Sequence, residues 1–203
     1  RAAQLGMRTA VVERAELGGI CLNWGCIPSK ALLRNAEVLS LVRRAEEFGI
    51  KYDNLRFDFG AAVDRSRQVV GKLTRGIAAL LRKNKVESIK GEAALCGPTT
   101  LEVKGSGQTP STSSGQALEA GHIVLATGAR ARSLPNLPID GELVVTSREA
   151  LERKDLPSAV VIVGGGAGGG VVADIYSAYG VPVSIVELLP HLLPNEDEEV
   201  SRA

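Results

Sequence analysis

The sequence has little of several features that mark common classes of protein. Its 203 residues carry a formal net charge of +1, so charge gives no reason to expect nucleic acid or an anionic membrane as a partner. The longest apolar run, Ala159 to Ala173, has 15 residues interrupted by glycines, whereas a membrane-spanning helix needs about 18. No aromatic residues interleave with the basic residues of 65–83, which favours a solvated helix face over a polyanion site.

The chain also shows no secretion signal and is poor in cysteine. The start RAAQLGMRTAVVE has no apolar core or small-residue cleavage site, and it does not begin with Met. We therefore expect a reducing compartment, the cytoplasm or, in a eukaryote, the mitochondrial matrix. There a disulfide is more often catalytic than structural. Two of the three cysteines, Cys21 and Cys26, share one short segment, GICLNWGCIPSK.

Residues 159–187 have the pattern of a dinucleotide-binding unit. An apolar strand, a glycine cluster, a helix to about Tyr179 and a second strand follow one another, ending at Glu187. Glycines let the backbone approach a pyrophosphate, and a carboxylate accepts hydrogen bonds from ribose hydroxyls. No Arg or Lys lies between Glu187 and Asn195, which favours NAD over NADP. The alternative is a glycine-rich turn of an unrelated α/β protein. The candidate NAD-binding residues are Gly164, Gly166, Gly169 and Glu187.

An internal repeat places part of a second such unit at the start of the chain. Residues 3–13 align without a gap on residues 177–187, at an offset of 174 positions. Each copy reads as a helix end, a glycine, a β-branched strand and a terminal Glu. By this register the first glycine loop would precede Arg1. The expected fold class is α/β, with two Rossmann-like nucleotide-binding folds, both incomplete. Glu13 is the candidate ribose acid, and the alternative is a solvated acid at a strand end.

Helices and short strands are expected between the two units. Ser29 is the expected cap of one helix that ends near Gly49, and Asp58 starts a longer one. His122–Ala126 reads as a buried strand that opens into a tight turn at Gly128. Other strands are expected at about 86–90 and 100–104, with a flexible hairpin loop over 105–115.

The spacing of the paired cysteines favours redox chemistry over a metal site or a staple. Zinc needs about four ligands, and Cys96, His122 and His191 are far away in sequence. We therefore predict no metal site, and a buried, apolar role for Cys96. A disulfide that closes so short a loop stabilises the fold by only about 2 kcal/mol in the chain-entropy model. A structural staple would therefore add little stability.

Positions i and i+5 of a regular helix are about 7.5 Å apart along its axis, beyond the usual disulfide limit of about 6.8 Å between Cα atoms. A bond from Cys21 to Cys26 therefore needs an irregular turn, which Gly25 and Pro28 can provide. A helix that begins just after Cys26 would stabilise its thiolate.

The segment GGICLNWGCIPSKALL resembles the redox-active signature of the flavin-dependent pyridine nucleotide-disulfide oxidoreductases. The likeness extends over nearly the whole chain, through LGMRTAVVE, VLATGARARSLP, VIVGGGAGG and VELLPHLLPNEDEE. It is greatest to the branch that oxidises dihydrolipoamide, with another disulfide reductase or a mercuric reductase as the alternative. The resemblance implies FAD and NAD as cofactors. It also implies an FAD-binding domain over 1–137, without its first strand and glycine loop, and the start of an NAD-binding domain over 138–203.

The resemblance also implies roles for individual residues. Cys21 would exchange with the dithiol substrate, and Cys26 would be the thiolate against the flavin. The expected partners are the lipoyl domain of a 2-oxoacid dehydrogenase or glycine cleavage complex, and a second subunit in a homodimer. The other flavin-site residues would be Lys30 at the reactive edge, Glu13 at the ribose, Ala93 at the adenine, and Thr127 with Gly128 nearby.

Two departures from the family pattern bear on activity. Val171 stands where family members usually have a Glu paired with the flavin-site lysine, here Lys30. The His–Glu pair that serves the partner subunit as acid and base lies outside this sequence, and neither His122 nor His191 can be assigned that role. We therefore expect this chain by itself to be an inactive fragment.

Overall fold

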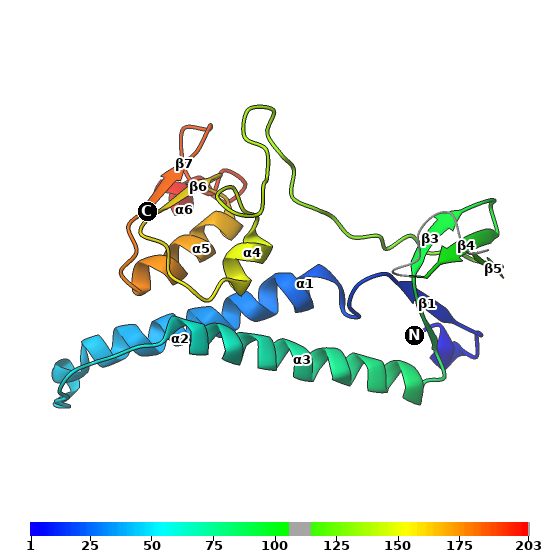
Figure 1. Ribbon diagram of the computed structural model, residues 1–203, viewed down its shortest axis with the longest axis horizontal. Coiled ribbons are helices and arrows are strands. Elements are labelled where there is room, and N and C mark those ends of the chain that lie inside the picture. Colours follow the sequence, from blue (N-terminus) through cyan, green and yellow to red (C-terminus); the bar gives the residue numbers. More distant parts are fainter. Residues whose placement is uncertain (106–114, 203) are drawn as a thin grey trace. The chain divides into compact units, whose positions relative to one another are not determined.

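The computed structural model describes residues 1–105 and 115–202 (Figure 1). Its contacts divide the chain into two compact units. The first unit contains Arg1–Asn23 and Gly71–Arg130, and the second contains Trp24–Val70 and Ala131–Ala203. The long helix α3 (Phe59–Lys83) contributes its first half to the second unit and its second half to the first. No helix in the described ranges is long and apolar enough to cross a membrane.

The first unit holds two small sheets, two short helices and the second half of α3. Strand β1 pairs in parallel with β2, in a register that joins Glu13 to Lys90. A separate antiparallel sheet has the strand order β3-β4-β5. The elements are η1 (Ala3–Leu5), β1 (Ala10–Glu13), α1 (Gly19–Trp24), β2 (Glu87–Lys90), β3 (Glu92–Leu95), β4 (Thr100–Lys104) and β5 (Gln116–Glu119).

The second unit contains the β-α-β pattern expected over 159–187. Strands β6 and β7 pair in parallel, and α5 connects them. Helices α2 and α5 pack together over an apolar core that includes Leu32, Val63 and Ile175. The rings of Phe59 and Tyr179 pack edge to face within that core, with centroids 4.8 Å apart. The elements are α2 (Cys26–Arg43), η2 (Ala45–Phe48), α4 (Ser147–Glu152), β6 (Val160–Val163), α5 (Ala167–Ala178), β7 (Val183–Val186) and α6 (Glu198–Arg202).

The internal repeat is confirmed by backbone conformation. Gly6 and Gly180 are equivalent at the offset of 174, and both adopt left-handed φ angles, 84° and 87°. The N–H of Gly6 donates to the carbonyl of Ala3 at 3.0 Å, and that of Gly180 to Ser177 at 2.9 Å. Because both glycines end a helical turn just before a parallel strand, the two copies share one local structure.

The helix ends differ in part from expectation. Asp58 caps α3 as predicted, because its Oδ1 accepts the N–H of Ala61 at 2.9 Å. The prediction that Ser29 caps the preceding helix is wrong. Helix α2 begins at Cys26 with Gly25 as its cap residue, and Ser29 lies inside its first turn. The chain turns at Gly25, so the helix starts one turn before the serine. It ends at Arg43, and η2 carries the chain on to Gly49.

Two predictions of burial are wrong. Residues His122–Ala126 form no strand, and Val124 and Leu125 are 88% and 66% exposed. A strand needs a neighbour to complete its hydrogen bonds, and no described strand pairs with this segment. Cys96 is exposed because it follows β3, whose residues are all exposed.

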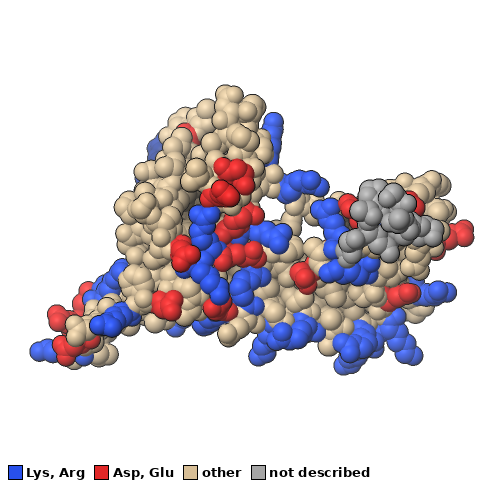
Figure 2. All heavy atoms as spheres, viewed as in Figure 1, with Lys and Arg blue, Asp and Glu red and all other residues tan. Residues whose placement is uncertain are grey.

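Two of the strands expected in the middle of the chain are present, with one small difference in bounds. The strand at 100–104 is confirmed, and the strand expected at 86–90 begins at Glu87. Of the expected hairpin loop, residues 106–114 lie outside the described residues, and β4 and β5 on either side of them are antiparallel. Figure 2 shows Lys and Arg side chains along the edge where Figure 1 places α3, as expected for a solvated basic face.

Candidate functional site

The cysteine pair lies at a break between two helices. Cys21 is in α1, Cys26 is the first residue of α2, and the two are joined by a disulfide bond. Gly25 between them has φ −134° and ψ −115°, outside the helical region, which confirms the expected irregular turn. Both cysteines are exposed, so a dithiol could reach the bond. Cys26 is at the N-terminus of an 18-residue helix, where the helix dipole favours a thiolate after reduction.

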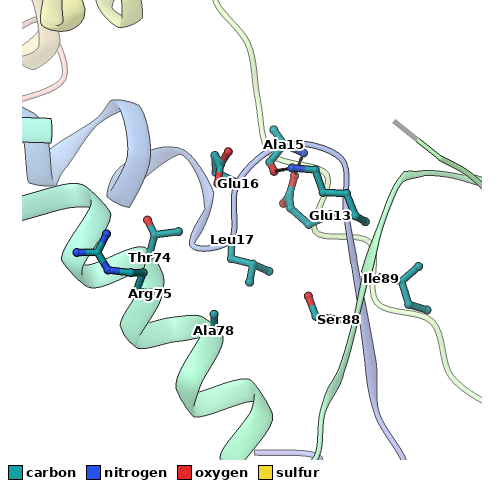
Figure 3. A pocket seen from close by; sticks show the side chains of 10 residues that line it. Glu13, Ala15, Glu16, Leu17, Thr74, Arg75, Ala78, Ser88 and Ile89 are labelled. Carbon is teal, nitrogen blue, oxygen red and sulfur yellow. Dashed lines mark hydrogen bonds between the residues drawn. The ribbon is translucent and has the colours of Figure 1, made fainter. Parts of the chain in front are cut away.

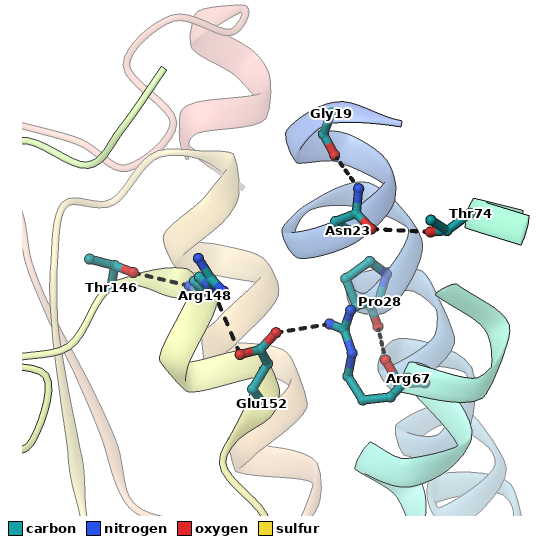
Figure 4. Close-up of polar contacts among 9 residues, drawn as sticks. Gly19, Asn23, Pro28, Arg67, Thr74, Thr146, Arg148 and Glu152 are labelled. Atoms are coloured by element: carbon teal, nitrogen blue, oxygen red, sulfur yellow. Dashed lines mark hydrogen bonds and ion pairs between the residues drawn. The ribbon is translucent and has the colours of Figure 1, made fainter. Parts of the chain in front are cut away.

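Asn23, next to the pair, fixes the shape of α1. It is 2% exposed, and its Nδ2 donates to the carbonyls of Leu17 and Gly19, both at 3.0 Å. Its Oδ1 accepts the hydroxyl of Thr74 at 3.2 Å (Figure 4). A buried amide with partners on three sides holds the helix that carries Cys21. The sequence analysis assigned no role to Asn23, although a lone polar residue between two cysteines was a signal for one.

Glycines also shape the approach to α1. Gly18 has φ +109°, and a Cβ at that position would lie 2.9 Å from Leu22 Cδ1. Gly128 has φ +73°, and a Cβ there would lie 3.4 Å from Ile20 Cδ1. Gly128 therefore lies beside Ile20 of α1 with a left-handed backbone, but the expected tight turn is absent, because residues 122–130 form no turn.

Lys30 projects from α2 and is exposed. Among the described residues it makes no ion pair. Val171, where an acid was expected from the family pattern, is partly buried against the apolar core. An apolar side chain suits that place, because a carboxylate there would need a partner.

Glu13 lies beside a pocket of about 270 Å³ in the first unit (Figure 3). Its Oε1 accepts the N–H of Ala15 at 2.8 Å. The carbonyl oxygen of the same Ala15 accepts a hydrogen bond from Lys90 Nζ at 2.7 Å. Arg14 pairs with Glu92 at 3.2 Å. The turn that follows β1 is therefore held by charged groups from β2 and β3.

Ala93 is close in sequence to this pocket but does not line it. It lies in β3, opposite Val103 of β4, and is exposed. Lys90, by contrast, lines the pocket, and the sequence analysis missed it. Its place opposite Glu13 across two parallel strands depends on pairing between residues far apart in the chain.

The glycine cluster of the second unit forms the connection between β6 and α5. Gly164 has φ +110°, and Gly166 is the cap residue of α5. A Cβ on Gly169 would lie 2.2 Å from the carbonyl oxygen of Gly164, so only glycine fits. The predicted spacing therefore corresponds to a close approach of helix and strand.

Glu187 closes onto this loop. Its Oε2 accepts the N–H of Gly165 at 2.6 Å, and its Oε1 accepts that of Leu189 at 2.9 Å. The hydrogen bonds from Leu189 and Gly165 hold the pKa of Glu187 below its ordinary value. The carboxylate is therefore ionised at neutral pH and lies beside the loop.

Some of the predicted residues fall into three groups, whereas Lys30, Ala93, Thr127 and Gly128 belong to none of them. Cys21 and Cys26 form the first group, Glu13 and its pocket the second, and the Gly164–Gly169 loop with Glu187 the third. In residues 1–105 and 115–202, no three His, Cys, Asp or Glu side chains are placed to hold a metal ion.

Comparison with known proteins relates the whole chain to one family. The family model described as "Pyridine nucleotide-disulphide oxidoreductase" matches residues 1–203. A dihydrolipoyl dehydrogenase of Chlorobaculum parvum is 49% identical over 202 residues, which are 100% of this chain and 42% of that protein. That of Bacillus subtilis is 41% identical over 210 residues, covering 100% of this chain and 43% of its own.

A solved structure shows the same arrangement of elements. The crystal structure of LpdA from Mycobacterium tuberculosis superposes with a TM-score of 0.85 and 26% identity, over 99% of this chain and 44% of that one. The chain thus spans less than half the length of the proteins it matches.

Proposed function

Because the chain belongs to the pyridine nucleotide-disulphide oxidoreductase family, we propose that the whole protein oxidises protein-bound dihydrolipoamide and passes the electrons to NAD⁺. The observation that carries this proposal is the exposed Cys21–Cys26 disulfide at the N-terminus of α2. The similarity to dihydrolipoyl dehydrogenases supports the choice of substrate. The partner is the lipoyl domain of a 2-oxoacid dehydrogenase or glycine cleavage complex, and the whole protein is a homodimer.

The exchange chemistry follows from the positions of the two sulfurs. A thiolate of dihydrolipoamide attacks Cys21 Sγ, which forms a mixed disulfide and breaks the bond to Cys26. Cys26 leaves as a thiolate, which the dipole of α2 stabilises. The second substrate thiol loses its proton and attacks the substrate sulfur of the mixed disulfide. The lipoamide ring closes and Cys21 departs. The substrate loses two electrons, and the cysteine pair gains them.

Residues of both units fit the nucleotides that this chemistry needs. Bound FAD would accept two electrons from the reduced pair, and NAD⁺ would receive them as hydride. In the first unit Glu13 has room beside it to accept ribose hydroxyls. The other proposed flavin-site residues are Lys30, Ala93, Thr127 and Gly128, and the proposed NAD-site residues are Gly164, Gly166, Gly169 and Glu187.

We also propose the division of the whole protein to which this chain contributes. Residues 1–137 belong to the FAD-binding domain, and residues 138–203 begin the NAD-binding domain. The 174-residue repeat supports this division, because each half contains one copy of the helix end, glycine, strand and terminal Glu. A reducing compartment, the cytoplasm, suits a disulfide that is opened in every cycle.

The test is an assay of the full-length protein with dihydrolipoamide and NAD⁺. We expect NADH to form at a rate that falls at least a thousandfold in both Cys21→Ser and Cys26→Ser, because neither variant can form the disulfide. Anaerobic reduction should give a long-wavelength thiolate-to-flavin band that is lost in Cys26→Ser. Turnover of glutathione disulfide or Hg²⁺ in place of dihydrolipoamide would instead assign the protein to another branch of the family.

A further inference from the structure

Trp24, the only tryptophan of the chain, lies between the two cysteines and packs against an arginine from a distant helix. The guanidinium carbon of Arg148, in α4, is 4.2 Å from the centroid of the Trp24 ring. That is well within the range of about 6 Å over which a cation is attracted to an aromatic face. Trp24 is the last residue of α1, so the contact holds the end of the helix that carries Cys21.

Arg148 is itself held in place by its own helix and by α3 (Figure 4). Its backbone N–H donates to the hydroxyl of Thr146, the cap residue of α4, at 3.2 Å. Its Nε lies 3.8 Å from Glu152 Oε2, and Glu152 Oε1 lies 3.4 Å from Arg67 Nη1 in α3. The guanidinium over the indole is thus one member of a chain of charges from α4 to α3.

The other side of the helix break is attached to the same helix α3. Ser66, which precedes Arg67, is fully buried and donates its hydroxyl to the carbonyl of Pro28 at 3.3 Å. Pro28 lies in the first turn of α2, two residues after Cys26. The residues before and after Gly25 are therefore each held from outside the turn, Trp24 by Arg148 and Pro28 by Ser66.

We propose that Arg148 is a positioning residue for the redox pair. By holding Trp24, it keeps the end of α1 close to the start of α2 when the disulfide is open, and so favours its closure. In the oxidised protein the covalent bond already restrains the turn. In the dithiol state the contact with Arg148 takes over that restraint, which raises the effective concentration of one thiol at the other. This inference rests on the proposed function, in which Cys21 and Cys26 cycle between disulfide and dithiol.

The experiment measures how easily the pair is reduced in the full-length holoprotein. The protein is equilibrated without oxygen in mixtures of reduced and oxidised dithiothreitol, and its thiols are then alkylated and counted. Cys21 and Cys26 gain two electrons and two protons, while the two thiols of the reagent become its cyclic disulfide. In Arg148→Ala we expect half-reduction at a ratio of reduced to oxidised reagent about two- to fivefold lower, the size of an exposed cation–π contact.

Matched variants separate positioning from a general loss of surface charge. Arg34→Ala removes an exposed arginine that pairs with Glu37 on α2, and it should leave the midpoint unchanged. Arg148→Lys should restore part of the shift. Trp24→Leu should shift the midpoint as Arg148→Ala does, and the double variant should shift it no further. Subtracting the emission spectrum of the matching Trp24→Phe variant isolates the emission of Trp24. In Arg148→Ala that emission should show a more exposed Trp24.

An unchanged midpoint in Arg148→Ala, or shifts that add in the double variant, would overturn the proposal. Its failure is distinct from failure of the proposed function. If the unaltered pair is reduced by dithiothreitol but not by dihydrolipoamide, the substrate assignment is wrong. If dihydrolipoamide reduces the pair but Arg148→Ala behaves as Arg34→Ala does, only the role of Arg148 is wrong.

Discussion

Glu13 and Glu187, 174 positions apart in the sequence, each accept a hydrogen bond from the backbone N–H two residues further along the chain. Glu13 takes the N–H of Ala15 at 2.8 Å, and Glu187 takes the N–H of Leu189 at 2.9 Å. Glu13 ends β1, and Glu187 directly follows β7, and each of these strands has a parallel neighbour. The acid at the strand end is thus part of the repeated structure. Glu187 has one partner more, the N–H of Gly165 in the glycine loop.

The hydrogen bonds of Glu187, first that from Leu189 and then that from Gly165, predict a pH dependence of stability. The folded-state pKa of Glu187 is lowered, so the carboxylate contributes stability above its unfolded pKa of about 4.5. The contribution is lost as the pH falls through the lower folded pKa. In urea unfolding of Glu187→Gln and the unaltered protein, we expect a difference that is constant above about pH 5 and shrinks below pH 4.5. A difference that already disappears between pH 6 and 8 would refute this assignment.

Two adjacent glycines of α5 should respond in opposite ways to alanine. At Gly169 a Cβ would meet the carbonyl oxygen of Gly164 at 2.2 Å, and we expect a loss of about 1–3 kcal/mol in unfolding free energy. NAD⁺ affinity should fall as well, because the loop must shift. At Gly168 nothing lies within 4 Å, so Gly168→Ala should raise stability by about 0.5–1 kcal/mol. Equal effects in chemical denaturation would show that the loop is not packed as described.

Asn23→Leu should destabilise the chain by about 1–3 kcal/mol. The change leaves the carbonyls of Leu17 and Gly19 and the hydroxyl of Thr74 without their bonds to Asn23. Thr74→Val removes only one of those bonds and should cost about 0.5–1.5 kcal/mol. The two substitutions should be less than additive in urea unfolding, and full additivity would mean that the residues act separately.

Lys90→Met should weaken flavin binding by the full-length protein about two- to tenfold. The ammonium holds the carbonyl of Ala15, whose N–H holds Glu13, so the ribose acid loses its support. Lys104→Met, on β4, removes a lysine that pairs with Glu102 instead and is the matched control. Flavin fluorescence on dilution measures how much flavin each of the two variants retains. Equal retention in the two variants would rule out a role for Lys90.

Cysteine alkylation should distinguish the three thiol positions. Cys96 is free and exposed, whereas Cys21 and Cys26 are bonded to each other. Iodoacetamide should therefore modify Cys96 alone in the oxidised chain, and all three cysteines after reduction with dithiothreitol. Peptide mass analysis provides the measurement. Modification of Cys21 or Cys26 before reduction would contradict the bonding seen in the structure.

Motifs with a regular local spacing could be predicted from the sequence. The strand, glycine cluster, helix and strand of 159–187 are local, because each is set by residues a few positions apart. The break between the cysteines was also predictable, since helix geometry excludes a disulfide between positions five apart. Apart from the helix cap assigned to Ser29 and the tight turn expected at Gly128, the errors lay where burial depends on distant residues. His122–Ala126 is as apolar as a strand, but no described strand pairs with it.

By itself the sequence determined the order of the elements, the two-copy pattern and the chemistry that its cysteines and glycines allow. Only the tertiary structure decided which groups meet. Asn23 reaches Thr74 across 51 positions, and Trp24 lies under Arg148 from another helix. Spacing and periodicity report interactions within one element or between neighbouring ones. Contacts between distant segments depend on how helices and strands pack, and no local pattern encodes them.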